Sequence, residues 1–234
     1  MATGHTVKAF DEDLDQLRAL IAEMGGLAEQ AIAESMRVLV QRDSEGALRI
    51  VEADARIDTL EAEVERQAVQ LIALRAPMAD DLREVVAALK IAGVVERIGD
   101  YAKNIAKRAR IVEDNPDIKP LSLLPEMARI AGEMVHDVLD AFVARDPAKA
   151  KAVCERDRAL DDFYNSIFRT LLTHMMENPH NITPATHLLF VAKNLERIGD
   201  HATNVAEMVY FASTGQHLTE RPRGEDPTQA GANG

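Results

Sequence analysis

The chain carries the same stretch twice, as LKIAGVVERIGDYAKNIA at residues 89–106 and as LFVAKNLERIGDHATNVA at residues 189–206. Recurrence at a fixed distance along the chain indicates a duplicated structural unit. Within each copy an acid, a second acid and an amide recur at four-residue steps, which places their oxygen atoms in one row along a helix. These residues are Glu96, Asp100 and Asn104 in the first copy, and Glu196, Asp200 and Asn204 in the second.

Around this repeat the whole sequence has the period of α-helices. Apolar residues recur at three- and four-residue steps, aromatic residues make up only 4% of the chain, and Trp is absent. Asp43 and Asp146 are predicted helix N-caps, whereas Pro77 and Pro179 mark helix ends. The predicted helices cover about residues 9–41, 44–75, 79–112, 124 onward, 147–177 and 183–213.

The predicted helices fall into two sets of three, separated by a polar segment that contains prolines. Helices of about thirty residues joined by short turns run antiparallel to their neighbours. We therefore predict an all-α protein of two tandem, pseudo-symmetric three-helix bundles with six long antiparallel helices. The first bundle covers residues 1–112, the linker 113–121, the second bundle 122–214, and a disordered tail 215–234.

Charge and composition exclude several kinds of partner. The net charge is −12, from 27 basic and 39 acidic residues. This sign disfavours nucleic acid and anionic membrane surfaces, but it suits cations or a basic patch on a partner protein. No apolar run approaches ~18 residues and no leader is recognisable, so we expect no membrane insertion. The single cysteine, Cys154, fits a reducing compartment, and we expect a cytoplasmic protein.

The carboxylates of the repeat are predicted to face away from the bundle core. Ile98 belongs to the apolar row of its helix, and Glu96 lies about 200° from it around the helix axis. Two further acid pairs flank the apolar rows of the second and fifth helices. If these helices lie beside the third and sixth, four carboxylates line one seam in each half, and such clusters suit Mg²⁺, Ca²⁺, Mn²⁺ or iron. The added pairs are Asp54 with Asp58 and Asp157 with Asp161.

A solvated helix face is the simpler explanation of these acids. Two carboxylates four residues apart on a helix repel each other by about 0.2–0.5 kcal/mol, unless a cation compensates. Both halves nevertheless keep this arrangement, although the neighbouring Lys103 has become Thr203 in the second copy. We therefore favour metal binding over surface ion pairs. The arginines that would form such ion pairs are Arg56, Arg97, Arg156 and Arg197.

Two further features of the repeat carry alternative explanations. Gly99 and Gly199 each cost about 1 kcal/mol inside a helix, so they indicate either close approach of a backbone or ligand, or simple helix packing. An apolar row also lies on the same outer side as the carboxylates and needs cover from the other half, a second copy or another protein. This row contains Leu82, Val86, Leu89 and Gly93.

The doubled Glu-Arg-Ile-Gly-Asp-x-Ala-x-Asn on paired three-helix units resembles the PhoU family of regulators of phosphate-specific transport. The resemblance covers about residues 7–213, and residues 76–83 and 188–204 are typical of the family. It implies that the acid pairs bind metal, with a divalent metal or iron (Mg, Mn, Zn or Fe) as cofactor. The implied ligands are Glu96, Asp100, Glu196, Asp200, Asp54, Asp58, Asp157 and Asp161, with Asn104 and Asn204 as additional candidates.

The resemblance also implies a function. The expected protein is a negative regulator of phosphate uptake and of the phosphate regulon. It would act as a non-catalytic adaptor, and as a homodimer, between the ATPase subunit of the phosphate ABC transporter and a phosphate-sensing histidine kinase. Tyr101 stands where the second half has His201, so a role of that histidine does not transfer to both halves.

A metal-binding or metal-storage bundle is the alternative function, and a purely architectural bundle is a third. A di-iron enzyme would need a Glu-x-x-His on each of two helices, whereas Glu133 and His136 form one such pair without a counterpart in the other half. The sequence contains no glycine-rich phosphate loop and no nucleophile elbow. We therefore expect a protein that is not an enzyme.

Overall fold

The structure, a computed structural model, describes residues 3–113 and 119–218. Its long elements are all α-helices and the described residues form no strand, which confirms the predicted fold class. The first half contains α1 (Thr3–Gln41), α2 (Ser44–Ala53), α3 (Ala55–Arg75) and α4 (Asp80–Ala106). The connection contains α5 (Ala109–Glu113) and the 3-10 helix η1 (Lys119–Leu123). The second half contains α6 (Leu124–Ala144), α7 (Pro147–Glu177), the 3-10 helix η2 (Pro179–Asn181) and α8 (Ile182–Thr214).

The two halves repeat each other down to individual hydrogen bonds. The turn after α1 places Arg42 in the left-handed region at φ 59°, and the turn after α6 does the same with Arg145 at φ 53°. Each following aspartate caps the next helix, as predicted: Asp43 accepts from the N–H of Gly46, and Asp146 accepts from that of Lys149. Corresponding residues therefore differ by 103 in number between α1–α3 and α6–α7, as Asp43 and Asp146 do. Between α4 and α8 they differ by 100, as Glu96 and Glu196 do.

The predicted helix over residues 44–75 is divided in the structure. The helix tightens at Asp54, where the N–H of Ile57 donates to the Asp54 carbonyl at 2.8 Å, three residues back instead of four. Its counterpart α7 runs without interruption from Pro147 to Glu177. The same part of the repeat therefore forms two helices, α2 and α3, in the first half and one helix, α7, in the second.

The predicted third helix, 79–112, also ends early. α4 ends at Ala106 because the chain tightens and the N–H of Arg108 donates to the carbonyl of Ile105 at 2.9 Å. The Arg108 side chain then bonds His187 of α8 at 3.0 Å. Of the predicted linker, residues 114–118 lie outside the described residues. So do residues 219–234 of the predicted tail.

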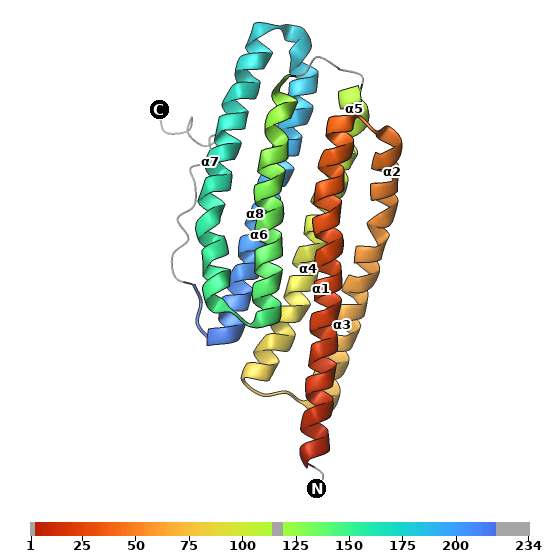
Figure 1. Cartoon of the computed structure of the whole chain (residues 1–234). Helices are drawn as coiled ribbons and strands as arrows, with labels where there is room; N and C mark the ends of the chain where they lie inside the picture. Colours follow the sequence, from red (N-terminus) through yellow and green to blue (C-terminus); the bar gives the residue numbers. More distant parts are fainter. Residues whose placement is uncertain (1–2, 114–118, 219–234) are drawn as a thin grey trace.

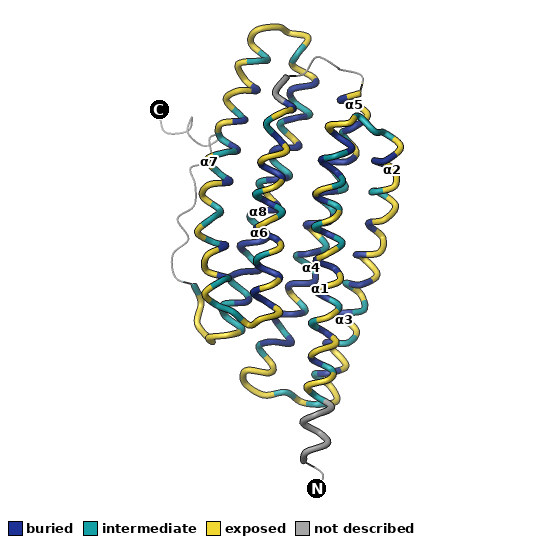
Figure 2. The backbone as a smooth tube through the Cα atoms, in the orientation of Figure 1, coloured by how far each residue is buried: buried dark blue, intermediate teal, exposed yellow. Residues whose placement is uncertain are grey.

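The halves share one hydrophobic core. In Figure 1, α2–α3 and α7 lie on opposite edges of the molecule, with the other long helices between them. α4 packs against α8, and α1 packs against α6, so most buried apolar residues of both halves form one cluster. A small second cluster lies in the first half and contains Val38, Ala47, Ala106 and Ala109. In Figure 2 buried and exposed positions alternate along each long helix, and exposed positions predominate at the tips. The rings of Tyr101 and His201, which occupy corresponding positions, meet edge to face at 5.2 Å between α4 and α8.

No helix among the described residues is long and apolar enough to cross a membrane.

Candidate functional site

The glycine of the repeated motif seats the neighbouring helix against the carboxylates. A Cβ on Gly99 of α4 would lie 2.8 Å from the Cδ1 atom of Ile57 and 3.3 Å from an Asp54 carboxylate oxygen on the α2–α3 helix. A Cβ on Gly199 of α8 would collide with Leu160 and lie 3.5 Å from an Asp157 oxygen. Of the two explanations given for these glycines, helix packing is therefore the one that the structure supports. The packing also brings an aspartate to each motif.

α3 packs against α4 and α7 packs against α8, which is the condition under which the sequence predicts one acidic seam in each half. Of these acids Asp54 is buried, Asp58 is exposed, and the others are half-buried. We call the contact of α3 with α4 the first seam; it holds Asp54, Asp58, Glu96, Asp100 and Asn104. The contact of α7 with α8 is the second seam; it holds Asp157, Asp161, Glu196, Asp200 and Asn204.

In the first seam a lysine side chain bridges acids from both sides of the contact. The ammonium group of Lys103 donates to Asp54 across the seam and to Asp100 on its own helix, at 2.5 Å from the Asp100 oxygen. Asp54 is only 8% exposed. Burial alone would lower the pKa of Lys103, but the hydrogen bonds to Asp100 and Asp54 outweigh it, so its pKa lies above the ordinary value. Lys103 is therefore a permanent cation that bridges the two helices.

The other end of the first seam gathers acids, one of which the sequence analysis missed. Burial, and then the nearby charge of Asp100, raise the pKa of Glu96. Glu61 of α3 contributes to the same effect, and its own pKa is raised by burial and by Asp58. Glu61 follows Asp58 by three residues and Asp54 by seven, a spacing that places all three on one helix face. That spacing could have identified it.

The lysine of the second seam stands at a different position and has different partners. Lys193 donates to one oxygen of Glu196, three residues further along α8, at 2.7 Å, and lies over the ring of Tyr164. The second oxygen of Glu196 is buried and has no hydrogen-bond partner. Burial raises the pKa of Glu196, the bond to Lys193 opposes this, and the charges of Asp200 and Asp161 add to it. The acids of α7 and α8 therefore lie close enough for their negative charges to repel one another.

The position that holds Lys103 in the first seam is uncharged in the second. Thr203 corresponds to Lys103, is fully buried, and donates from Oγ1 to the backbone carbonyl of Asp200 at 2.7 Å. Asn104 and Asn204 are half-buried beside these positions. The two seams thus share their acids but not their cations.

In the described part of the chain, the predicted metal ligands do not form a complete coordination site. Among the described residues, no group of three His, Cys, Asp or Glu side chains is placed to hold a metal ion. The donors of the second seam nevertheless fit a hard cation, because they are carboxylates and one Glu196 oxygen lacks a hydrogen bond. In the first seam, the ammonium group of Lys103 already bridges Asp54 and Asp100, so these two residues do not fit a metal in this arrangement.

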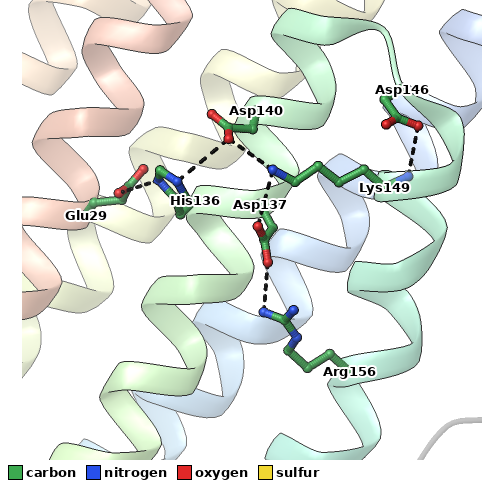
Figure 3. A network of polar contacts seen from close by, with 7 residues as sticks. All are labelled: Glu29, His136, Asp137, Asp140, Asp146, Lys149 and Arg156. Carbon is green, nitrogen blue, oxygen red and sulfur yellow. Dashed lines mark hydrogen bonds and ion pairs between the residues drawn. The ribbon is translucent and has the colours of Figure 1, made fainter.

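The halves also differ in the groove beside the seams. In the first half a cavity of about 250 Å³ is lined by Gly46, Ala53, Asp54 and Lys103, among others. In the second half Lys149 and Arg156 take the places of Gly46 and Ala53. Figure 3 shows that these two side chains reach a network of acids on α6. Lys149 pairs with Asp137 and Asp140 at 3.3 and 3.0 Å, and Arg156 donates to Asp137 at 2.8 Å.

His136 extends this network to the first half. Its Nδ1 lies 3.1 Å from a carboxylate oxygen of Glu29 on α1, and its Nε2 lies 3.7 Å from Asp140. His136 belongs to the Glu-x-x-His pair noted in the sequence, together with Glu133. Glu133 bonds Arg129 instead. Glu133 and His136 therefore contact different side chains at the surface and do not form one site.

The fold and its seams define a class of protein: an all-α chain of two pseudo-symmetric three-helix units, each with the same acidic motif against a neighbouring helix. The family model for the PhoU domain matches residues 21–109 and 124–209, so that each half matches once. The chain belongs to the PhoU family.

Relatives and solved structures agree with this assignment. A protein of Zymomonas mobilis, named phosphate-specific transport system accessory protein PhoU homolog, is 58% identical over 95% of this chain and 94% of its own length. A Caulobacter vibrioides protein of the same name is 49% identical over 94% of this chain and 97% of its own. The crystal structure of PhoU from Pseudomonas aeruginosa superposes with a TM-score of 0.85 at 33% identity, covering 88% of this chain and 100% of that one.

Proposed function

We propose that this protein is a non-catalytic accessory protein of a phosphate-specific transport system. In this role it restrains phosphate uptake and keeps the phosphate regulon off while phosphate is ample. The observation that carries the proposal is the 58% identity, over nearly the whole of both chains, to a protein named phosphate-specific transport system accessory protein PhoU homolog. The proposal extends to an adaptor role in the cytoplasm, between the transporter's ATPase subunit and a phosphate-sensing histidine kinase.

The surface of the molecule supports a role in binding other proteins. Large apolar side chains are exposed at the two tips where the outer helix of each half meets the next. Leu74 and Met78 are 71% and 80% exposed at the α3–α4 tip, and Met176 is 86% exposed at the α7–α8 tip. Exposed apolar groups of this size favour contact surfaces. We include a homodimer in the proposal, since Leu82 of the outer apolar row is also exposed.

A reporter strain tests the regulatory proposal. The gene is deleted, and a phosphate-regulon reporter is measured in phosphate-rich medium, with and without the gene restored in trans. We expect the reporter to rise in the deletion strain and to return to its basal level on complementation. An unchanged reporter in the deletion strain would refute the regulatory role. Co-purification with the ATPase subunit and the kinase, and light scattering for the dimer, test the partners separately.

We further propose that the second seam binds a divalent cation or iron. The unsatisfied buried oxygen of Glu196 favours this second function, and Asp157, Asp161 and Asp200 are the other acids that would hold the ion. The cation would neutralise the seam and fix α7 against α8; it has no chemical step to perform. Asp161→Asn should lower the metal retained by the purified protein, whereas Asp162→Asn, at the exposed neighbouring position, should not. Equal metal content in both variants would contradict the proposal.

A further inference from the structure

Lys103 in the first seam and Thr203 in the second occupy corresponding positions but differ in charge. Their equivalence follows from the gap-free repeat on α4 and α8. The packing around them agrees, since Gly99 faces Asp54 and Ile57 just as Gly199 faces Asp157 and Leu160. At this position the two seams therefore differ by a lysine in place of a threonine.

Lys103 occupies the place that a bridging cation would need. A metal in the seam has to bind carboxylates from both helices at once, and Lys103 does so already through Asp54 of the outer helix and Asp100 of α4. Thr203 offers no charge at the same place, and its hydroxyl is directed to the backbone of its own helix. Lys193, the lysine of the second seam, donates to Glu196 on its own helix and lies over the ring of Tyr164 of α7.

We infer that Lys103 is a built-in replacement for the cation of the first seam, so that the protein binds metal in its second seam only. The inference rests on the metal binding proposed above for the second seam. A dication entering the first seam would have to displace an ammonium group from two acids, and the displaced ammonium would remain tethered next to the metal. Like charges at that distance oppose binding, whereas the second seam presents no such competitor at Thr203.

The test uses the full chain, stripped of metal and titrated with Mn²⁺, and bound Mn²⁺ is measured by elemental analysis after equilibrium dialysis. Lys103→Thr, which copies the second seam into the first, should bind at least one more Mn²⁺ per chain than the wild type. Adding Asp100→Asn to Lys103→Thr should remove that gain. In the wild-type background Asp200→Asn should abolish binding, and Asp100→Asn should leave it unchanged.

The reciprocal variant keeps the inference testable if Lys103→Thr does not fold, as judged by circular dichroism. Thr203→Lys places the lysine in the second seam and should abolish Mn²⁺ binding. Unchanged binding in Lys103→Thr, or loss of wild-type binding on Asp100→Asn, would overturn the role of Lys103 and leave the proposed metal function standing. Binding by Lys103→Thr but not by the wild type would support the role of Lys103 and refute metal in the second seam. No binding by either protein would refute both.

Discussion

The first and second seams share the same acidic motif, but their lysines stand at different positions and make different contacts. In the first, Lys103 joins acids of two helices, and a cavity remains beside it where Gly46 and Ala53 lie. In the second, Lys193 pairs within its own helix, and the corresponding groove carries Lys149 and Arg156 with their acids (Figure 3). The comparison teaches that the positions which pack helices were kept after duplication, while the positions which balance charge diverged.

The variants with the largest expected effect test whether the two halves unfold together or independently. Ile98 and Ile198 occupy corresponding positions, and both are fully buried in the common cluster. Truncation of a buried isoleucine to alanine costs about 2–5 kcal/mol of unfolding free energy. We expect Ile98→Ala and Ile198→Ala to lower the same single urea transition by similar amounts. If either variant instead produces two transitions, with one half melting first, the halves are independent bundles.

The fold followed from the sequence because its determinants are local. Helix period, the N-caps Asp43 and Asp146 and the proline-marked ends place the helices. At both departures the structure shows contacts between residues distant in sequence. Asp54, where the second helix tightens, is held by Lys103 forty-nine positions away, and Arg108, where α4 ends, is held by His187. A pattern along one helix cannot show such partners.

A second pair of variants tests the kept packing. Gly99→Val and Gly199→Val place a branched side chain where even a Cβ is in close contact with Ile57 or Leu160. Overpacking of this kind costs about 1–3 kcal/mol, and the β-branch places both variants at the upper end. Gly132, where a Cβ would meet nothing within 4 Å, supplies the control, and Gly132→Ala should be neutral or stabilising. Thermal denaturation measures all three; undiminished stability of both valine variants would show that the seams do not need their glycines.

The site was only partly predictable. Four-residue spacing identified the acids of each seam, since that spacing defines a helix face. A pattern of paired acids does not include Glu61, although Glu61 continues the helix face of Asp54 and Asp58. The sequence shows that Lys103 is three residues from Asp100, but its contact with Asp54 depends on how closely α4 approaches the outer helix.

The next prediction compares the corresponding positions Lys103 and Thr203 in the absence of metal. Lys103→Met leaves Asp54 and Asp100 without their shared partner, and loss of hydrogen bonds to a partly buried charged group costs about 1–3 kcal/mol. Thr203→Val removes a hydroxyl that bonds only its own helix, and it should cost less than about 1 kcal/mol. Urea unfolding in EDTA measures the difference. Equal costs would mean that the two positions contribute alike and that the seams have not diverged in this respect.

The smallest expected effect is a gain in stability, in contrast to the losses predicted above, and it depends on pH. Because its surroundings raise the pKa of Glu196 in the folded protein, ionisation of this group opposes folding. The favourable contribution of Glu196 is present in full below the pKa of the unfolded chain, about 4.3, and is lost as the pH rises through the folded value. Glu196→Gln, which cannot ionise, should therefore melt at a higher temperature than the wild type at pH 7, and the gap should close toward pH 4. Glu96→Gln should behave in the same way, since burial and Asp100 raise the pKa of Glu96. A melting temperature for Glu196→Gln that falls below the wild type at pH 7 in EDTA would mean that the bond to Lys193 outweighs burial, and that the second seam is closed by its lysine as firmly as the first.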